Sequence, residues 1–154
     1  SQWVSKTMGL NRFVSCQDEY NILNRNVEAE LIPAMQKYGC GLLPYFPLAS
    51  GLLTGKYKRT EMPEGARLTD MPTFANRIYL TDENFDIVDN LNKFAKKTGH
   101  SILELAFGWM ASRPTTASII AGATKPEQIE ANVAAVNWVL SQSEIDEVDK
   151  ISAR

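Results

Sequence analysis

Strand-like and helical segments alternate along this chain, and the alternation constrains its fold more than any other feature of the sequence. Short runs rich in β-forming residues lie at positions 12–16, 42–46 and 117–121, with helical periodicity between and after them. Such an order predicts parallel β/α units joined by right-handed crossovers. A complete (β/α)8 TIM barrel has eight strands and takes about 250 residues. The sequence therefore predicts an α/β fold that is part of such a barrel, with about three parallel strands and flanking helices.

Capping signals and apolar spacing place the helices. Pro33 fits the first turn of a regular helix that begins near Leu31 and that Gly39 closes. Capping boxes at residues 101–104 and 124–127, each with its first residue as the cap, open two further helices. Helical segments are also expected at residues 3–8, at residues 85–95 and from residue 143, and a long connection at residues 49–80.

Charge and apolar run length exclude two classes of partner. The formal net charge is −2, so the chain has no basic field that recruits nucleic acid or anionic lipid. Its apolar stretches are far shorter than the roughly 18 residues that indicate a membrane span. Cys16 and Cys40 are interpreted as free, buried cysteines, and a reducing cytoplasm is the expected compartment.

Polar and aromatic residues follow each predicted strand, where barrel enzymes place their chemistry. Gln17 follows the first strand, and its side chain can both donate to and accept from a carboxamide. Taken alone, a glutamine that bonds its own loop is the simpler interpretation. The sequence leaves both open at this position.

The second strand is followed by an aromatic residue and then by small residues. Tyr45 offers a flat face on which a ring can stack. Glycines after it, Gly51 among them, let backbone N–H groups approach a phosphate, and Lys56 adds a positive charge. The alternative is a core tyrosine before a flexible loop; the density of small residues before Lys56 favours phosphate binding.

The third predicted strand leads into a capped helix. Gly122, Thr124 and Lys125 lie at this N-terminus, where free N–H groups and the helix dipole favour an anion. Gln128 and Asn132 are four residues apart and share one helix face, from which they could reach an adenine edge. An ordinary surface helix with polar residues in water is the alternative.

Taken in this order, the three patterns resemble the aldo-keto reductase family over essentially the whole chain. The resemblance is closest to the microbial branch that includes the beta subunits of voltage-gated potassium channels. Phe46 stands where the family commonly has serine, and Ala121 where it commonly has proline. The matching stretches are Gln17 with Tyr20-Asn21, Glu30-Leu31-Ile32-Pro33, Tyr45 to Tyr57, Ala106-Phe107-Gly108-Trp109 and Ile120 to Asn132.

The resemblance implies a nicotinamide dinucleotide as the cofactor. Cationic residues are expected at the adenine end of this nucleotide, and they favour NADPH over NADH. Gln17 would bond the nicotinamide carboxamide, and Tyr45 would stack on the nicotinamide ring. The backbone of a clamp around Phe46, Leu48 and Gly51, with Lys56, would hold the pyrophosphate. At the other end of the nucleotide, the resemblance implies that Arg67 contacts the adenine or its ribose phosphate. It implies a 2′-phosphate site at Gly122, Thr124 and Lys125, and adenine contacts from Gln128 and Asn132.

The resemblance also implies what the chain lacks. The family's catalytic tyrosine, lysine, aspartate and histidine belong to the amino-terminal half, so none is assigned here. The one histidine, His100, is expected to be a solvent-facing loop residue. Residues 1–154 would then be the carboxyl-terminal, NADP-binding half of the barrel, inactive alone.

The expected function of the full-length enzyme is to reduce an aldehyde or ketone to an alcohol, with a small-molecule carbonyl compound as substrate. Two alternatives stay open: an NADPH-sensing regulatory subunit like the potassium channel beta subunits, and a truncated fragment that is inactive alone. A half-barrel exposes sheet edges and a core face, through which it could form a homo-oligomer.

Overall fold

The computed structural model describes residues 1–70 and 78–154 of the chain. It has an open α/β architecture with parallel strands, which confirms the predicted class. The strands are β1 (Ser15–Glu19) and β2 (Gly41–Tyr45). The helices are α1 (Gln2–Thr7), α2 (Leu31–Tyr38), α3 (Arg67–Asp70), α5 (Asp82–Lys97), α6 (Ile102–Ala111), α7 (Pro126–Ala135) and α8 (Gln142–Ile151), with 3₁₀ helices at Asn26–Glu28 and Ala49–Thr54.

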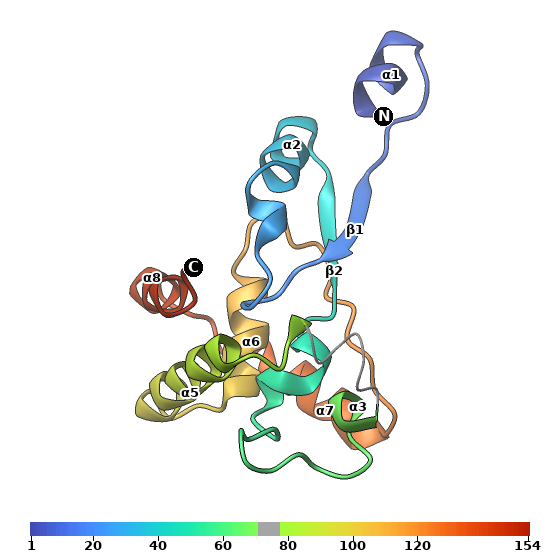
Figure 1. The fold of residues 1–154 in the computed structure, drawn as a ribbon. Helices are drawn as coiled ribbons and strands as arrows, with labels where there is room; N and C mark the ends of the chain where they lie inside the picture. Colours follow the sequence, from blue (N-terminus) through green and yellow to red (C-terminus); the bar gives the residue numbers. More distant parts are fainter. Residues whose placement is uncertain (71–77) are drawn as a thin grey trace.

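The two strands lie side by side in parallel register (Figure 1). Ser15 pairs with Gly41, and Glu19 pairs with Tyr45. The prediction of a first strand at residues 12–16 is wrong in its bounds, because the partner strand offers no pairing before Gly41. Gln17 therefore lies within β1 and not after it.

The predicted third strand is reduced to two isolated parallel bridges to β2, Leu42 with Thr116 and Tyr45 with Ile120. The bridges are three residues apart on β2 (45 − 42) and four apart on the other segment (120 − 116), so the segment carries one extra residue. Pro44 lies between the bridges and has no N–H to donate to the ladder, although its carbonyl accepts from Ile120 N–H at 2.9 Å. The proline thus explains why a regular strand does not form.

Most helix predictions are confirmed, but the long connection predicted at residues 49–80 contains the 3₁₀ helix Ala49–Thr54 and α3, and its residues 71–77 lie outside the described residues. α2 begins at Leu31 and ends at Tyr38, and its C-cap Gly39 has a left-handed φ of 61°. In α6, the Ser101 hydroxyl accepts from the Glu104 N–H at 3.2 Å, and the Glu104 carboxylate accepts from the Ser101 N–H at 2.8 Å. α8 has the same type of cap, at Ser141, and begins one residue earlier than predicted.

The predicted cap of α7 is wrong. Lys125, and not Thr124, is the N-cap, because Pro126 takes the first helical position and Gln128 then becomes the third. The Gln128 side-chain oxygen accepts from the backbone N–H groups of Thr124 at 2.7 Å and Lys125 at 3.2 Å. This glutamine therefore closes the turn that the sequence assigned to Glu127.

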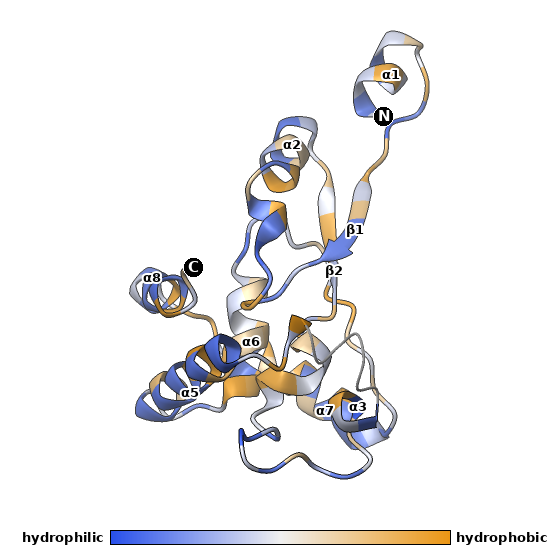
Figure 2. Cartoon of the chain, viewed as in Figure 1, coloured by the Kyte–Doolittle hydropathy of each residue, from blue (hydrophilic) through white to orange (hydrophobic). Residues whose placement is uncertain are grey.

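The core lies where α5 and α6 pack beneath the strand ends, with Trp109 fully buried at its centre. Tyr20 packs against Trp109 with ring centroids 5.3 Å apart. Gly108 allows α6 to approach residue Leu140, since a Cβ there would lie 2.5 Å from its side chain. Figure 2 shows hydrophilic and hydrophobic residues on both α5 and α8, as expected for helices with one face in water.

A polar network attaches α8 to this core. Asp149 accepts from Trp109 Nε1 at 2.8 Å and from Arg25 at 2.9 Å, and it also contacts Arg113. The Arg113 guanidinium lies over the Trp109 ring at 4.0 Å. One carboxylate therefore joins the end of the chain to two distant arginines.

Two further sequence predictions concern the cysteines and membranes. Cys16 and Cys40 are free, as expected, and both are half-buried. Over residues 1–70 and 78–154, no helix is both long enough and apolar enough to cross a membrane.

Candidate functional site

The ends of three segments lie at one edge of the fold. Glu19 at the end of β1 pairs with Tyr45 at the end of β2, and Tyr45 bridges Ile120. Gly122 follows Ile120 by two residues. The backbone pairing thus brings all three predicted strand ends together, although the third segment is not a regular strand.

Gln17 and Tyr45 share one face of the sheet. Residues in register in a parallel pair point to the same side, and side chains alternate along each strand. Gln17 pairs with Leu43, and Tyr45 lies two residues beyond Leu43, so both side chains belong to that side. Gln17 is exposed and Tyr45 is half-buried, whereas Leu42 on the opposite face is fully buried. The carboxamide and the aromatic ring are therefore available on the same accessible face.

Glu19 shares this face but is held by neutral donors. The Tyr79 phenol and the Asn24 side-chain amide, the latter at 2.9 Å, both donate to its carboxylate. Burial raises the pKa of Tyr79, and its hydrogen bond to Glu19 raises it further, so the phenol keeps its proton. The carboxylate is thus fixed at the rim of the site.

The turn after β2 has an unusual backbone. Phe46, Ala49 and Ser50 have left-handed φ values of 53°, 47° and 56°, and Gly51 has a φ of 99°. A non-glycine residue in this region costs on the order of 1–3 kcal/mol and persists only where its surroundings hold it. The Gly51 N–H donates to Leu48 O at 2.8 Å, so Gly51 contributes space rather than a free donor.

Lys56 folds back over this turn. A Cβ on Gly51 would lie 3.0 Å from Lys56 Cε and 3.3 Å from its Nζ, so the glycine makes room for the lysine. Lys56 Nζ lies 5.1 Å from the Tyr57 ring centroid. Two of the predicted site residues, Gly51 and Lys56, therefore lie in contact, and a larger residue at position 51 would displace the Lys56 side chain.

Arg67 approaches the same turn from α3. Its guanidinium lies 5.0 Å from the ring centroid of Phe46. The Tyr57 hydroxyl accepts from the Leu68 N–H at 3.0 Å, which attaches α3 to the segment that carries Lys56. Two cations, Lys56 and Arg67, are thus held around the turn at residues 46–51.

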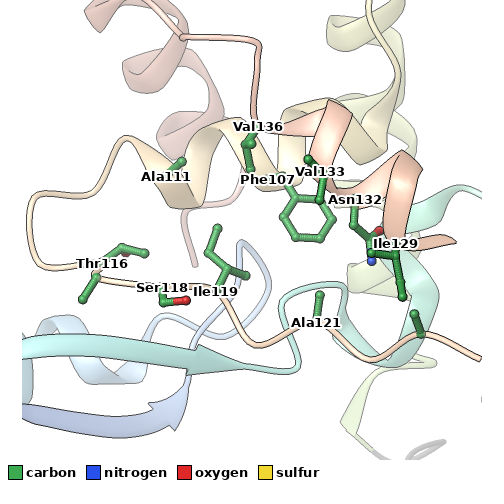
Figure 3. A pocket seen from close by; sticks show the side chains of 12 residues that line it. Phe107, Ala111, Thr116, Ser118, Ile119, Ala121, Ile129, Asn132, Val133 and Val136 are labelled. Atoms are coloured by element: carbon green, nitrogen blue, oxygen red, sulfur yellow. The ribbon is translucent and has the colours of Figure 1, made fainter. Parts of the chain in front are cut away.

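The remaining predicted residues lie at α7. Gly122, Thr124 and Lys125 are exposed before the helix, and Gln128 uses its oxygen to close that turn. Asn132 lines a cavity of about 430 Å³ between α6, α7 and residues 116–123, whose walls are mostly apolar (Figure 3). The Ile120 bridge brings the start of the segment that leads into α7 to the same edge as Tyr45.

Sequence reasoning missed Asn21 and misplaced His100. Asn21 is fully buried after β1, and its side chain reaches the turn after β2. His100 is half-buried, stacked on Trp138 with ring centroids 3.9 Å apart and 3.1 Å from Glu104, so its assignment as a solvent-facing residue is wrong. Close packing of α6 against residues 138–140 explains its burial. An asparagine directly after a strand was the available signal for Asn21.

Polar, aromatic and cationic side chains are present at the candidate site. They comprise a carboxamide and an aromatic ring on one face, two cations around a tight turn, and a third cation, Lys125, at a helix N-terminus. Among the residues that the structure describes, no three His, Cys, Asp or Glu side chains gather as a metal site. The donors present thus suit phosphates and a planar ring.

Comparison with known proteins shows the same family that the sequence patterns resemble. The sequence model described as "Aldo/keto reductase family" matches residues 1–153. A probable voltage-gated potassium channel subunit beta of Oryza sativa subsp. japonica is 42% identical over 141 residues, which cover 89% of this chain and 42% of the relative. L-glyceraldehyde 3-phosphate reductase of Escherichia coli (strain K12) is 34% identical over 87% of this chain and 40% of the relative. NADH-specific methylglyoxal reductase of the same strain is 36% identical over 83% and 38%. The chain thus spans about two fifths of the length of these relatives.

Proposed function

The chain belongs to the aldo/keto reductase family, and from this membership we propose that it forms the NADPH-binding part of an oxidoreductase that reduces aldehydes or ketones to alcohols. The observation that carries the proposal is the convergence of three segment ends at Glu19, Tyr45 and Ile120. In a barrel, this edge of the strands is where ligands bind.

The nicotinamide end is assigned to the accessible face of the sheet. Gln17 can donate to and accept from the ring's carboxamide, and Tyr45 offers a face for stacking. The two side chains lie on the same face, as one ligand requires. Gln17 and Tyr45 would hold and orient the nicotinamide ring, which would supply the hydride when bound.

The phosphates are assigned to the cations. Lys56 and Arg67 surround the turn that contains Phe46, Leu48 and Gly51, which suits a pyrophosphate. The resemblance implied that Arg67 lies at the adenine or its ribose phosphate, and its position 5.0 Å from the Phe46 ring is our reason to propose the pyrophosphate instead. Gly122, Thr124 and Lys125 precede α7, where the Lys125 ammonium and the helix dipole suit the 2′-phosphate that distinguishes NADPH from NADH. The backbone N–H groups of Thr124 and Lys125 already donate to Gln128, so the charge of Lys125 carries this assignment. Gln128 and Asn132 are assigned to the adenine, Gln128 through its amide group because its oxygen closes the turn.

This chain contributes binding and not proton transfer. We assign it no catalytic residue, and we expect the substrate, a small carbonyl compound, to meet its acid on further polypeptide. Among the residues that the structure describes, β1 pairs only with β2, and exposed Phe13 and Val14 directly precede the strand. We propose its other edge, together with the exposed Ile129 and Val133 on α7, as the surface for that polypeptide or for a second copy. Light scattering on the isolated chain tests self-association.

A second function is favoured by the names of two relatives. Proteins of Oryza sativa and Arabidopsis thaliana that are 42% and 37% identical to this chain are described as probable potassium channel beta subunits. The same site would then sense NADPH without a metabolic substrate. Turnover of aldehydes by the protein that contains this chain separates the two functions, because a sensor binds the nucleotide and reduces little.

Nucleotide binding by the 154-residue chain tests the shared part of both functions. Titration followed by NADPH fluorescence should give tighter binding of NADPH than of NADH by about tenfold at low salt, since one more phosphate meets Lys125. Equal affinity for the two nucleotides would remove the assignment of the 2′-phosphate site. No binding of either at millimolar concentration would contradict the proposed cofactor.

A further inference from the structure

Asn21 uses its whole side chain to join two loops. The residue is fully buried and lies two positions beyond the last residue of β1. Its Oδ1 accepts from the N–H groups of Leu23 and Asn24, both at 2.9 Å, and its Nδ2 donates to the Phe46 carbonyl at 3.0 Å. A buried carboxamide is costly unless its groups are bonded, and this one is bonded at both ends. The side chain therefore fixes the turn after β2 to the end of β1.

The carbonyl to which Asn21 donates belongs to Phe46, the first residue of the turn at residues 46–51. Phe46 O also accepts from the Ala49 N–H at 3.0 Å, so one oxygen is shared by the turn's own bond and by Asn21. Phe46 has a left-handed φ of 53°, and Ala49 and Ser50 repeat that conformation. Such residues need support from outside the turn, and Asn21 supplies it.

The position of the cations depends on this turn. The Phe46 ring lies under the Arg67 guanidinium, and Lys56 packs on Gly51. If Phe46 relaxed to an ordinary φ, its ring and the residues up to Gly51 would move. The supports of Arg67 and Lys56 would move with them.

We propose that Asn21 is a positioning residue that holds the turn at residues 46–51 in its phosphate-binding conformation without touching the nucleotide. The inference rests on the proposed function, because it assigns phosphate binding to this turn. Asn21 acts through the Phe46 carbonyl, and its loss affects the pyrophosphate end of the ligand more than the end bound at α7.

The test compares two chemically identical substitutions. Asn21→Asp keeps the size and the acceptor of the side chain but replaces the donor to Phe46 O by a carboxylate oxygen. Asn84→Asp is the matched control, since Asn84 is also buried and its amide donates to the carbonyls of Ile78 at 3.1 Å and Tyr79 at 2.9 Å, outside the turn. Urea unfolding of both variants measures their stability, and binding is compared where both are folded.

Three ligands are titrated by calorimetry: NADPH, inorganic pyrophosphate and adenosine 2′-monophosphate. At pH 8, Asn21→Asp should weaken NADPH and pyrophosphate binding by about tenfold or more, and leave adenosine 2′-monophosphate unchanged. As the pH falls, the carboxyl group at position 21 is protonated and can again donate to Phe46 O. Binding of NADPH and pyrophosphate should therefore recover in Asn21→Asp and not in the unsubstituted chain or in Asn84→Asp. Asn84→Asp should leave all three affinities unchanged.

Equal losses for the three ligands, or the same pattern in both variants, would overturn the inference and leave the proposed function standing. If the unsubstituted chain bound none of the three ligands, the proposed function would fail and the inference with it. The two failures are therefore distinguishable.

Discussion

Tyr45 forms a parallel bridge with Ile120, so β2 and the segment that leads into α7 end at the same level. Glu19 pairs with Tyr45 from the other side. Residues separated by about a hundred positions in the sequence therefore lie at one edge of the fold. Under the proposed function, a single elongated ligand would contact Gln17 and Tyr45 at one end and Lys125 at the other.

The Tyr45 ring is expected to act through its face. Replacing Tyr45 by alanine should weaken NADPH binding by about tenfold to a hundredfold, because stacking on an aromatic side chain is worth roughly 1–3 kcal/mol. Tyr45→Phe keeps the ring and should bind within about twofold of the unsubstituted chain. Fluorescence titration measures both. An equal loss in the two variants would assign the effect to the hydroxyl and remove the stacking role.

Gly51 is expected to be required by Lys56 as well as by its backbone. In Gly51→Ala, the new methyl group would lie 3.0 Å from Lys56 Cε and the residue would keep a φ of 99°. We expect a loss of about 1–2 kcal/mol in the free energy of unfolding and weaker pyrophosphate binding.

Gly65→Ala is the matched control for this change. Gly65 has a φ of 67°, and a Cβ there meets no atom of residues 1–70 and 78–154 within 4 Å, so backbone strain is the expected effect. It should lose stability but keep its affinity for pyrophosphate. Equal binding losses in the two variants would show that Lys56 is not positioned through Gly51.

Lys125 is expected to set the preference between the two nucleotides. Lys125→Ala should weaken NADPH binding by about tenfold and leave NADH binding unchanged, because only NADPH carries the 2′-phosphate. Lys97→Ala, at the exposed end of α5, should alter neither. Titrations at low and moderate salt measure the ratio of the two affinities. A parallel loss for NADPH and NADH would place Lys125 at the pyrophosphate.

The capping boxes of α6 and α8 should make stability depend on acid pH. The Ser101 N–H holds the pKa of Glu104 below its ordinary value, and the Ser141 hydroxyl does so for Glu144. In the acid range, the unfolded chain then binds protons that the folded chain does not, so stability is full above the ordinary glutamate pKa and falls as pH drops below it.

Urea unfolding between pH 3 and pH 7 measures this dependence. The double variant Glu104→Gln with Glu144→Gln keeps a side chain that can accept from the caps but removes both charges. Its unfolding free energy should fall less steeply below pH 4.5, the ordinary glutamate value. An unchanged slope would mean that other carboxylates dominate.

Asp149 is expected to be the main anchor of α8. Asp149→Ala removes the acceptor of Trp109 Nε1 and leaves Arg25 and Arg113 without this carboxylate. We expect a loss of roughly 2–3 kcal/mol in the free energy of unfolding. Asp146→Ala on the exposed side of the same helix should cost less than about 0.5 kcal/mol. Similar losses for the two aspartates, measured by urea unfolding, would contradict the anchor.

The sequence predicted the helices better than the strands, for a physical reason. The Ser101 cap and the Gly39 stop are set by residues within a few positions, so the local pattern was sufficient. The bounds of β1 depend on where Gly41 begins to pair with it, and the third strand fails because of Pro44 in its neighbour. Both outcomes depend on residues of the neighbouring strand β2, so neither could be predicted from the strand's own sequence.

The same contrast between local and distant determinants applies to the candidate site. The sequence predicted Gln17, Tyr45 and Lys56 as site residues from residue type near the predicted strand ends, and the register brings the first two to one face. It could not identify the support of Asn21, because that hydrogen bond crosses from one strand end to the next. The burial of His100 was missed for the same reason, since Trp138 lies far along the chain.

Nuclear magnetic resonance of the labelled chain, titrated with NADPH to millimolar concentration, tests whether the three segment ends form one nucleotide site. We expect the amides of Gln17, of residues 45–51 and of residues 122–128 to shift together and to follow one dissociation constant. Shifts confined to one of these segments, or separate constants for different segments, would show that the three ends do not form a single nucleotide site.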